Sequence, residues 1–123
     1  MATTVLIIDD SNTMRKIVQR SLRQAGFEFD KVLEAGDGLE ALAVLGAEKV
    51  DLILSDINMP NMDGLEFLRQ KAANDAIKGI PVVMITTEAG ADILGEARAL
   101  GAKGSIKKPF TAEQVQEVLG GLL

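Results

Sequence analysis

Short apolar runs alternate with segments of helical periodicity along the whole sequence, and this alternation constrains the fold more than any other feature. Five runs have the length of strands: residues 5–8, 31–35, 51–56, 80–86 and 104–107. The first is continuously apolar, the fourth is nearly so, and the third has the apolar centre Leu52-Ile53-Leu54; such runs are typical of parallel strands buried on both faces. The sequence therefore predicts an α/β fold of the (βα)5 type, a doubly wound parallel sheet whose right-handed crossovers place helices on both faces.

Capping residues and apolar stripes mark the five helices between and after these runs. Ser11 or Asn12 is placed to cap the first helix, Asp63 the third and Thr111 the last. The stripes predicted to face the core are Met14, Ile17, Val18, Leu22 and Ala25; Leu39, Leu42 and Leu45; Leu65 and Leu68; Ile93, Ala97 and Leu100; and Val115, Val118, Leu119 and Leu122. We expect residues 1–123 to form a single domain without an output domain.

The composition excludes several classes of function. The chain has no cysteine and no histidine, which rules out disulfides, iron–sulfur clusters, thiolate zinc sites, serine-type triads and haem ligation by histidine. Its 13 basic and 18 acidic residues give a net charge of −5 with no basic stripe, so we expect no nucleic-acid binding. No segment resembles a signal peptide or a membrane span, and we expect a cytoplasmic protein with no membrane partner.

Chemically active side chains are predicted at the carboxyl ends of four strands, which meet at one edge of a parallel sheet. They are Asp9 and Asp10 after the first strand, Asp56 after the third, Thr86 and Thr87 after the fourth, and Lys107 and Lys108 after the fifth. Carboxylates that gather in one place repel each other unless a cation neutralises them, and Mg²⁺ suits a site of few carboxylates. Charge neutralisation, positioning and a nucleophile are what phosphoryl transfer requires. Asp56 is the candidate nucleophile, because a carboxylate that attacks phosphorus forms an acyl phosphate.

Four separated motifs carry a resemblance to a known family. The sequence resembles the receiver domain of two-component response regulators, of the stand-alone CheY type, in its segments Ile8-Asp9-Asp10-Ser11, residues 54–64 (LSDINMPNMDG), Ile85-Thr86-Thr87 and Lys108-Pro109-Phe110. The resemblance extends over the whole chain with matching spacing. It implies a flavodoxin-like sheet with the strand order 2-1-3-4-5.

The resemblance also implies roles for the acidic residues. Asp56 would be the phospho-acceptor. One Mg²⁺ would be bound by Asp10, Asp56 and the backbone carbonyl of Asn58, and by Asp9 through a water molecule. Asn58 and Glu88 would tune the access of water to the acyl phosphate.

The resemblance also implies that Lys108 contacts the phosphoryl oxygens. Thr86 would donate a hydrogen bond to the phosphoryl group and would shift when this group arrives. The peptide bond before Pro109 would be cis. We expect Lys108 to lie at a hydrated rim. Thr87 and Lys107 are interpreted as surface neighbours without a role.

One position departs from the family pattern. Members of the family often carry Tyr or Phe three residues before the lysine, where the ring moves as the threonine shifts, and here that residue is Ser105. No ring can rotate at this position. Met59 and Met62 are interpreted as residues that fill gaps around their loop.

The implied function is a phosphorylation-controlled signalling switch. A histidine kinase would donate its phosphohistidine phosphoryl group, and this donor must be another protein because the chain lacks histidine. The switch would be a monomer that relays the signal by reversible protein contact in chemotaxis, motility or a phosphorelay. A downstream protein would bind the face made by the fourth helix, the fifth strand and the fifth helix, and a phosphatase would be a further partner. The chain would catalyse only its own phosphorylation and dephosphorylation.

Three alternatives stay open on the sequence. The first is a receiver-fold interaction module that works without phosphorylation. The second is an aspartyl-nucleophile phosphatase, although such enzymes use an Asp-x-Asp pattern and Asp10 is followed by Ser11-Asn12. The third is a flavodoxin, although Asp9 and Asp10 occupy the loop that would receive a phosphate.

Overall fold

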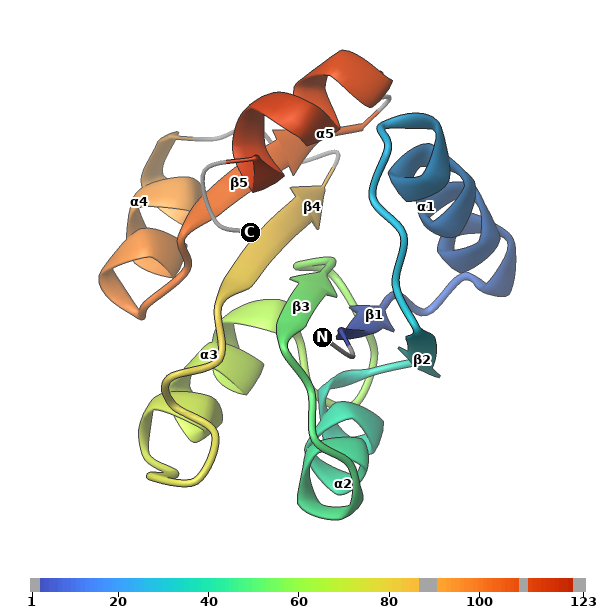
Figure 1. The fold of residues 1–123 in the computed structure, drawn as a ribbon. Coiled ribbons are helices and arrows are strands. Elements are labelled where there is room, and N and C mark those ends of the chain that lie inside the picture. The colour runs from blue at the N-terminus through green and yellow to red at the C-terminus, as the bar shows by residue number, and fades with distance from the viewer. Residues whose placement is uncertain (1–2, 87–90, 109–110, 121–123) are drawn as a thin grey trace.

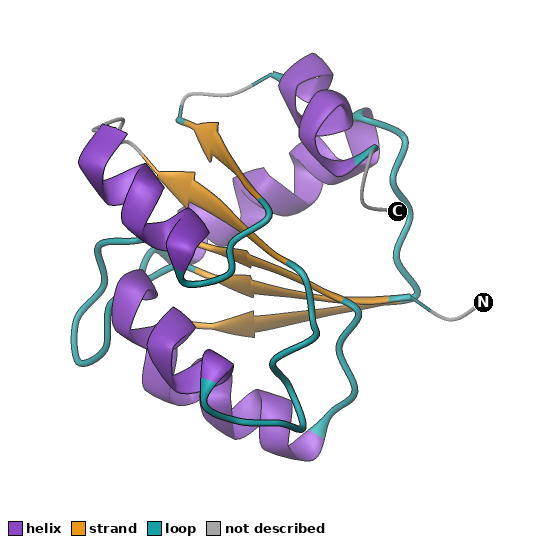
Figure 2. Ribbon diagram, turned by 90° about the vertical axis from the view of Figure 1, so that its left-hand side faces the viewer, coloured by secondary structure: helices purple, strands orange, loops and turns teal. Residues whose placement is uncertain are grey.

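A five-stranded parallel sheet with helices on both faces forms the molecule (Figures 1 and 2). The computed structural model describes residues 3–86, 91–108 and 111–120. The strands are β1 (Thr4–Ile8), β2 (Lys31–Ala35), β3 (Leu52–Ser55), β4 (Val82–Thr86) and β5 (Gly104–Lys107), in the order β2-β1-β3-β4-β5. The helices are α1 (Asn12–Gln24), α2 (Gly38–Ala47), α3 (Gly64–Ala72), α4 (Ala91–Ala99) and α5 (Ala112–Leu119). The predicted fold class and strand order are therefore confirmed.

Two hydrophobic layers hold the helices against the sheet. Side chains that are neighbours along a strand point to opposite faces, so each buried strand serves both layers. Leu6 and Ile8 of β1 belong to the layer under α2, α3 and α4, whereas Val5 and Ile7 belong to the layer under α1 and α5. Figure 2 shows the strands between these helices with all arrows pointing the same way. The loops after the strands consequently gather on one side of the molecule.

Capping residues occupy the predicted helix ends. The side chains of Ser11, Asp63 and Thr111 each accept a hydrogen bond from the backbone N–H three residues later, at the starts of α1, α3 and α5. Gly26 and Gly101 follow α1 and α4 with φ values of 90° and 112°, in the left-handed region that favours glycine. The three predicted helix caps are confirmed, and Ser11 rather than Asn12 is the cap of α1.

Some predicted details are wrong. Ile17 is 41% exposed and Leu39 is 54% exposed, although both were predicted to face the core. In α1 the neighbouring Val18 is buried, and in α2 the buried residue is Ala41. The strip of each helix that contacts the core is therefore narrower than the apolar stripe in its sequence. The third and fourth strands are also shorter than residues 51–56 and 80–86. Leu122 lies outside the described residues.

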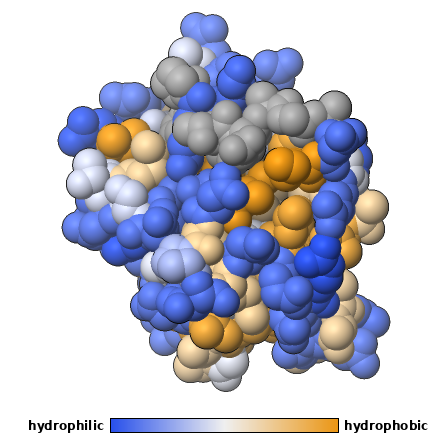
Figure 3. All heavy atoms as spheres, turned by 180° about the vertical axis from the view of Figure 1, so that it is seen from behind, coloured by the Kyte–Doolittle hydropathy of each residue, from blue (hydrophilic) through white to orange (hydrophobic). Residues whose placement is uncertain are grey.

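The side toward which the strands point carries a mixed surface. Figure 3 views this side from behind Figure 1 and shows hydrophilic side chains over much of it, with an area of hydrophobic atoms in the upper right part. In the part of the chain that the structure describes, no helix combines the length and apolar character that a membrane crossing needs.

Candidate functional site

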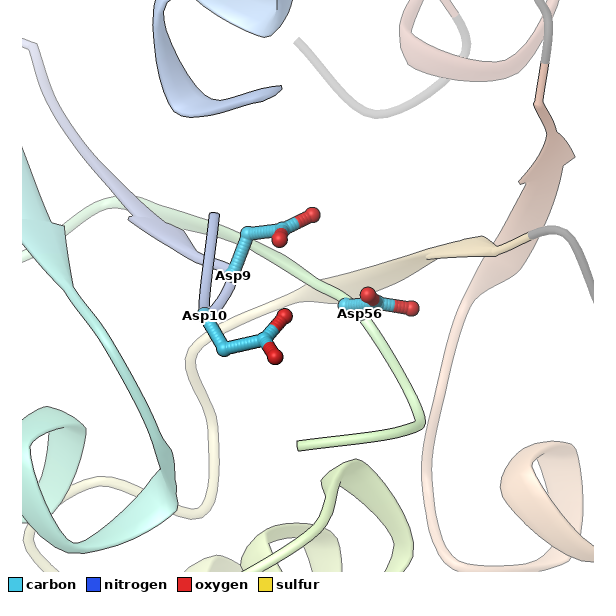
Figure 4. A group of neighbouring side chains, drawn as sticks. All are labelled: Asp9, Asp10 and Asp56. Atoms are coloured by element: carbon cyan, nitrogen blue, oxygen red, sulfur yellow. The ribbon is translucent and has the colours of Figure 1, made fainter. Parts of the chain in front are cut away.

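Three carboxylates meet where β1 and β3 end. Ile8 and Ser55 are partners in the register of these neighbouring strands, so the residues that follow them lie side by side. Asp9, Asp10 and Asp56 each offer a carboxylate oxygen, and these atoms all lie within 4.8 Å of one another. Figure 4 shows the three side chains, two from the segment after β1 and one from the end of β3. The predicted meeting of these carboxylates is thus present in the structure.

The three carboxylates differ in their surroundings. Asp9 is buried, Asp10 is exposed and Asp56 is half-buried. One oxygen of Asp9 accepts the N–H of Ser11 at 2.9 Å, and Oδ1 of Asp56 accepts the N–H of Ile57 at 2.7 Å. Burial raises the pKa of the Asp56 carboxyl above its ordinary value, and the ammonium group of Lys108 opposes this rise. Both hydrogen bonds fix the orientation of a carboxylate that lies partly away from water.

Lys108 provides the positive charge of the site. Its Nζ lies 2.8 Å from Oδ2 of Asp9 and 3.3 Å from Oδ2 of Asp56. Its side chain is only 9% exposed, so the expectation of a hydrated rim is wrong at this residue, because the ammonium is enclosed between the two carboxylates. Lys107 is exposed, as its interpretation as a surface neighbour requires.

The donor set of the cluster fits a hard divalent cation. Asp9, Asp10 and Asp56 bring three negative charges when ionised, and Lys108 neutralises one of them. The two charges that remain equal those of one Mg²⁺, and carboxylate oxygens are the ligands that Mg²⁺ prefers. Within residues 3–86, 91–108 and 111–120, this is the one group of three acidic side chains close enough to share an ion.

The loop between β3 and α3 is fixed at its base by backbone contacts. The N–H of Gly64 donates to the carbonyl of Ile57 at 2.7 Å. A Cβ atom at Gly64 would lie 2.3 Å from the carbonyl oxygen of Asp56, so only glycine fits here. Asn58 is exposed within this loop, while Met59 and Met62 are half-buried and pack against the core, in accord with their interpretation as gap fillers.

A second loop is bonded to this one, which the sequence analysis missed. Asp37 is 7% exposed and caps α2, since its Oδ1 accepts the N–H of Glu40 at 2.8 Å. Its Oδ2 accepts a hydrogen bond from Nδ2 of Asn61, also at 2.8 Å. These hydrogen bonds, that from Asn61 above all, hold the pKa of Asp37 below its ordinary value. Asp37 followed by Gly38 could have signalled the cap, but nothing in the sequence signals the partner Asn61.

The remaining predicted site residues are only partly described. Thr86 ends β4 and is the register partner of Lys107, which places it at the same edge of the sheet. Its side chain, together with Thr87, Glu88 and Pro109, lies outside the described residues. Ser105 is half-buried on β5.

Comparison with known proteins decides the family. Residues 5–120 match the model of the response regulator receiver domain. The chain belongs to the response regulator receiver domain family. It is 44% identical to the chemotaxis protein CheY-3 of Vibrio cholerae serotype O1 over 115 residues, which are 94% of this chain and 87% of that protein.

Solved receiver domains agree with this assignment. The structure of the chemotaxis response regulator CheY4 of Vibrio cholerae matches with a TM-score of 0.85 and 37% identity, over all of both chains. CheY in the CheX–CheY–BeF3–Mg complex of Borrelia burgdorferi matches with a TM-score of 0.82 and 30% identity, over 98% of this chain and 90% of that one. The chain is thus a receiver domain of the CheY type, from a family in which phosphorylation and Mg²⁺ are typical.

Proposed function

We propose that this receiver domain is a switch in chemotaxis that takes a phosphoryl group from a phosphohistidine of a histidine kinase onto Asp56. The P–N bond of the donor breaks as an oxygen of Asp56 bonds to phosphorus, and the electron pair of the broken bond returns to the imidazole nitrogen. The observation that carries the proposal is the group of three carboxylates, two of which contact the poorly exposed ammonium of Lys108. Asp10, Asp56 and the carbonyl of Asn58 would hold one Mg²⁺, with Asp9 acting through a water molecule, and the ion would supply positive charge for the phosphoryl oxygens.

The contacts of Asp56 favour one of its oxygens as the acceptor. Oδ1 already accepts the N–H of Ile57 at 2.7 Å, whereas Oδ2 faces Nζ of Lys108 at 3.3 Å. A phosphoryl group on Oδ2 would lie beside the ammonium, which can bind its oxygens at once. Asp9 holds Lys108 from the other side at 2.8 Å and keeps the charge in place. Thr86 would add a hydroxyl donor, and Glu88 with Asn58 would set the access of water.

The output we propose is reversible protein contact through α4, β5 and α5. A surface hollow of about 370 Å³ lies on β5 and α5 and is lined in part by Ser105, Lys107 and Glu117. A phosphatase is a further proposed partner, since the CheY of Borrelia burgdorferi was solved with CheX. The domain would act on no substrate other than its own Asp56. With no ring at Ser105, activation would proceed through Thr86 and residues 88–97.

Intact mass spectrometry tests the acceptor. Wild-type protein incubated with acetyl phosphate and Mg²⁺ should gain the mass of one phosphoryl group. Asp56→Asn should abolish the adduct, and removal of Mg²⁺ by a chelator should do the same. Asp63→Asn is the matched control, because Asp63 is an exposed carboxylate of the same loop and should leave the adduct unchanged.

Two outcomes would overturn the proposal. An equal adduct on Asp56→Asn would place the phosphoryl group elsewhere. A wild-type protein that never gains an adduct, from acetyl phosphate or from a phosphorylated histidine kinase, would favour the second candidate, a receiver-fold module that binds partners without phosphorylation.

A further inference from the structure

The loop of residues 57–63 is held at two points, one at its base and one near its tip. At the base, the N–H of Gly64 bonds to the carbonyl of Ile57 at 2.7 Å. Near the tip, Asn61 bonds to Asp37 at 2.8 Å, and the N–H of Gly38 bonds to the carbonyl of Met62 at 3.1 Å. The stretch between these points contains Asn58. The path of its backbone is therefore set by the β2–α2 loop as well as by its own strand.

The burial of Asp37 shows that it does more than cap a helix. Asp63 caps α3 equally well, with a hydrogen bond of 2.8 Å to Glu66, and remains exposed. Asp37 caps α2 with a bond of the same length but is 7% exposed. A buried carboxylate is costly unless both oxygens find donors, and the second donor is Asn61.

Asn61 has a backbone conformation that needs support. Its φ of 64° lies in the left-handed region, which asparagine tolerates better than most residues but which still carries strain. Strained conformations persist only where the surroundings hold them. The hydrogen bond to Asp37 is such a hold, because it ties the side chain of Asn61 to a buried, rigid acceptor.

We propose that Asp37 is a positioning residue for the divalent cation: through Asn61 it holds the loop in the conformation that presents the backbone carbonyl of Asn58 to the ion. This inference rests on the magnesium site of the proposed function. Asp37 itself touches neither the ion nor the phosphoryl group. Without its hydrogen bond, the loop would populate several conformations, and the apparent affinity would fall with the fraction that is competent to bind.

Calorimetric titration of the metal-free protein with Mg²⁺ tests the inference directly. Asp37→Ser keeps a good cap for α2 but has no second oxygen to accept the N–H of Asn61, so the loop-to-loop hydrogen bond is lost. Asn61→Gly keeps the left-handed backbone accessible and removes the donor. We expect each change to weaken Mg²⁺ binding about tenfold, as substitutions of groups that orient metal ligands do.

The double variant Asp37→Asn/Asn61→Asp provides the rescue. It reverses donor and acceptor, restores the hydrogen bond and leaves the net charge equal to that of the wild type. We expect its Mg²⁺ affinity to return to within about threefold of the wild-type value, which is a smaller loss than either single variant should show. Circular dichroism and unfolding without metal accompany every titration, so that affinity is compared between folded proteins.

Asp63→Asn separates positioning from charge. It removes one negative charge from the same loop and retains a capping side chain, so its Mg²⁺ affinity should stay close to that of the wild type. Equal losses in Asp37→Ser and Asp63→Asn, or unchanged affinity in Asn61→Gly, would overturn the inference. Wild-type protein that binds no Mg²⁺ would instead contradict the proposed site itself, which distinguishes the two failures.

Discussion

The junction of β3 with α3 and the neighbouring helix α4 each contain a glycine, and the two glycines lie in opposite surroundings. At the junction, Gly64 is pressed against the backbone of Asp56 and leaves no room for a methyl group, and α3 buries Phe67 and Leu68. In α4, nothing lies within 4 Å of where a Cβ of Gly95 would be. The side that carries the proposed acceptor is thus fixed by backbone contacts, whereas the helix proposed to respond contains an exposed glycine, which lowers its helix propensity. Phosphoryl transfer needs reacting groups that are held in position, whereas a switch needs an element whose conformational equilibrium a modest signal can shift.

Gly64→Ala should produce the largest effect on stability. The new methyl group would meet a backbone oxygen that cannot rotate away, and overpacking of this kind costs about 3 kcal/mol. Chemical denaturation measures the loss, which we expect together with weaker Mg²⁺ binding because the loop base moves. A stable Gly64→Ala protein with unchanged metal affinity would show that the junction is less rigid than the contrast requires.

Lys108→Ala should come next. Without the ammonium, two poorly exposed carboxylates face each other, and we expect a loss of about 2 kcal/mol in the absence of metal. Added Mg²⁺ should recover part of this loss, because the ion supplies the missing charge. Lys107→Ala is the control and should change the unfolding free energy by less than about 0.5 kcal/mol. If the two variants had equal unfolding free energies, the enclosure of Lys108 between the carboxylates would not contribute to stability.

Gly95→Ala should act in the opposite direction. An exposed glycine inside a helix costs about 0.5–1 kcal/mol relative to alanine, so this change should stabilise the protein by that amount. It should also reduce any change of hydrogen exchange in residues 91–97 on phosphorylation. Ser105→Ala, which removes a hydroxyl but no ring, should leave that change intact. Loss of the response in Ser105→Ala alone would make the serine a switch residue.

The smallest effect concerns Glu34 at the end of β2. The pKa of Glu34 is lowered mainly by the hydrogen bond from Lys16 and then by that from Arg15. The ion pairs of Glu34 therefore stabilise the fold above the ordinary pKa of glutamate, and this stabilisation is lost as the pH falls through the lowered pKa. Glu34→Gln should therefore be less stable than the wild type at pH 7, by less than about 1 kcal/mol, with a difference that vanishes in acid. Glu48→Gln, at the exposed pair with Lys31, should have almost no effect at pH 7. A difference for Glu34→Gln that persists at pH 2 would argue against the ion pairs as its source.

Local rules predicted most of the fold and the acidic side of the site. Runs of β-branched residues gave the strands, Ser11, Asp63 and Thr111 gave helix starts, and the rule that parallel strands end at one edge brought Asp9 and Asp56 together. Each of these predictions depends on residues that are close in sequence or on a general property of parallel sheets.

What could not be predicted depends on tertiary packing. The burial of Lys108 follows from two carboxylates that approach it from other strands, and the partner of Asp37 is 24 residues away in another loop. Ile17 and Leu39 fit a helical stripe, but the width of the stripe that reaches the sheet is set by how each helix docks. Side-chain periodicity alone carries none of this information.

The contact between Lys108 and Asp9 joins residues 99 positions apart in the chain. During synthesis, all three carboxylates leave the ribosome long before the lysine does, and the pair can form only after β5 has docked on β4. A nascent or truncated chain that ends before β5 therefore carries Asp56, the proposed acceptor, without its ammonium partner. Completion of the charged site is consequently coupled to completion of the fold, and under the proposed function a protein cut short before its last strand would lack the ammonium that binds the phosphoryl oxygens.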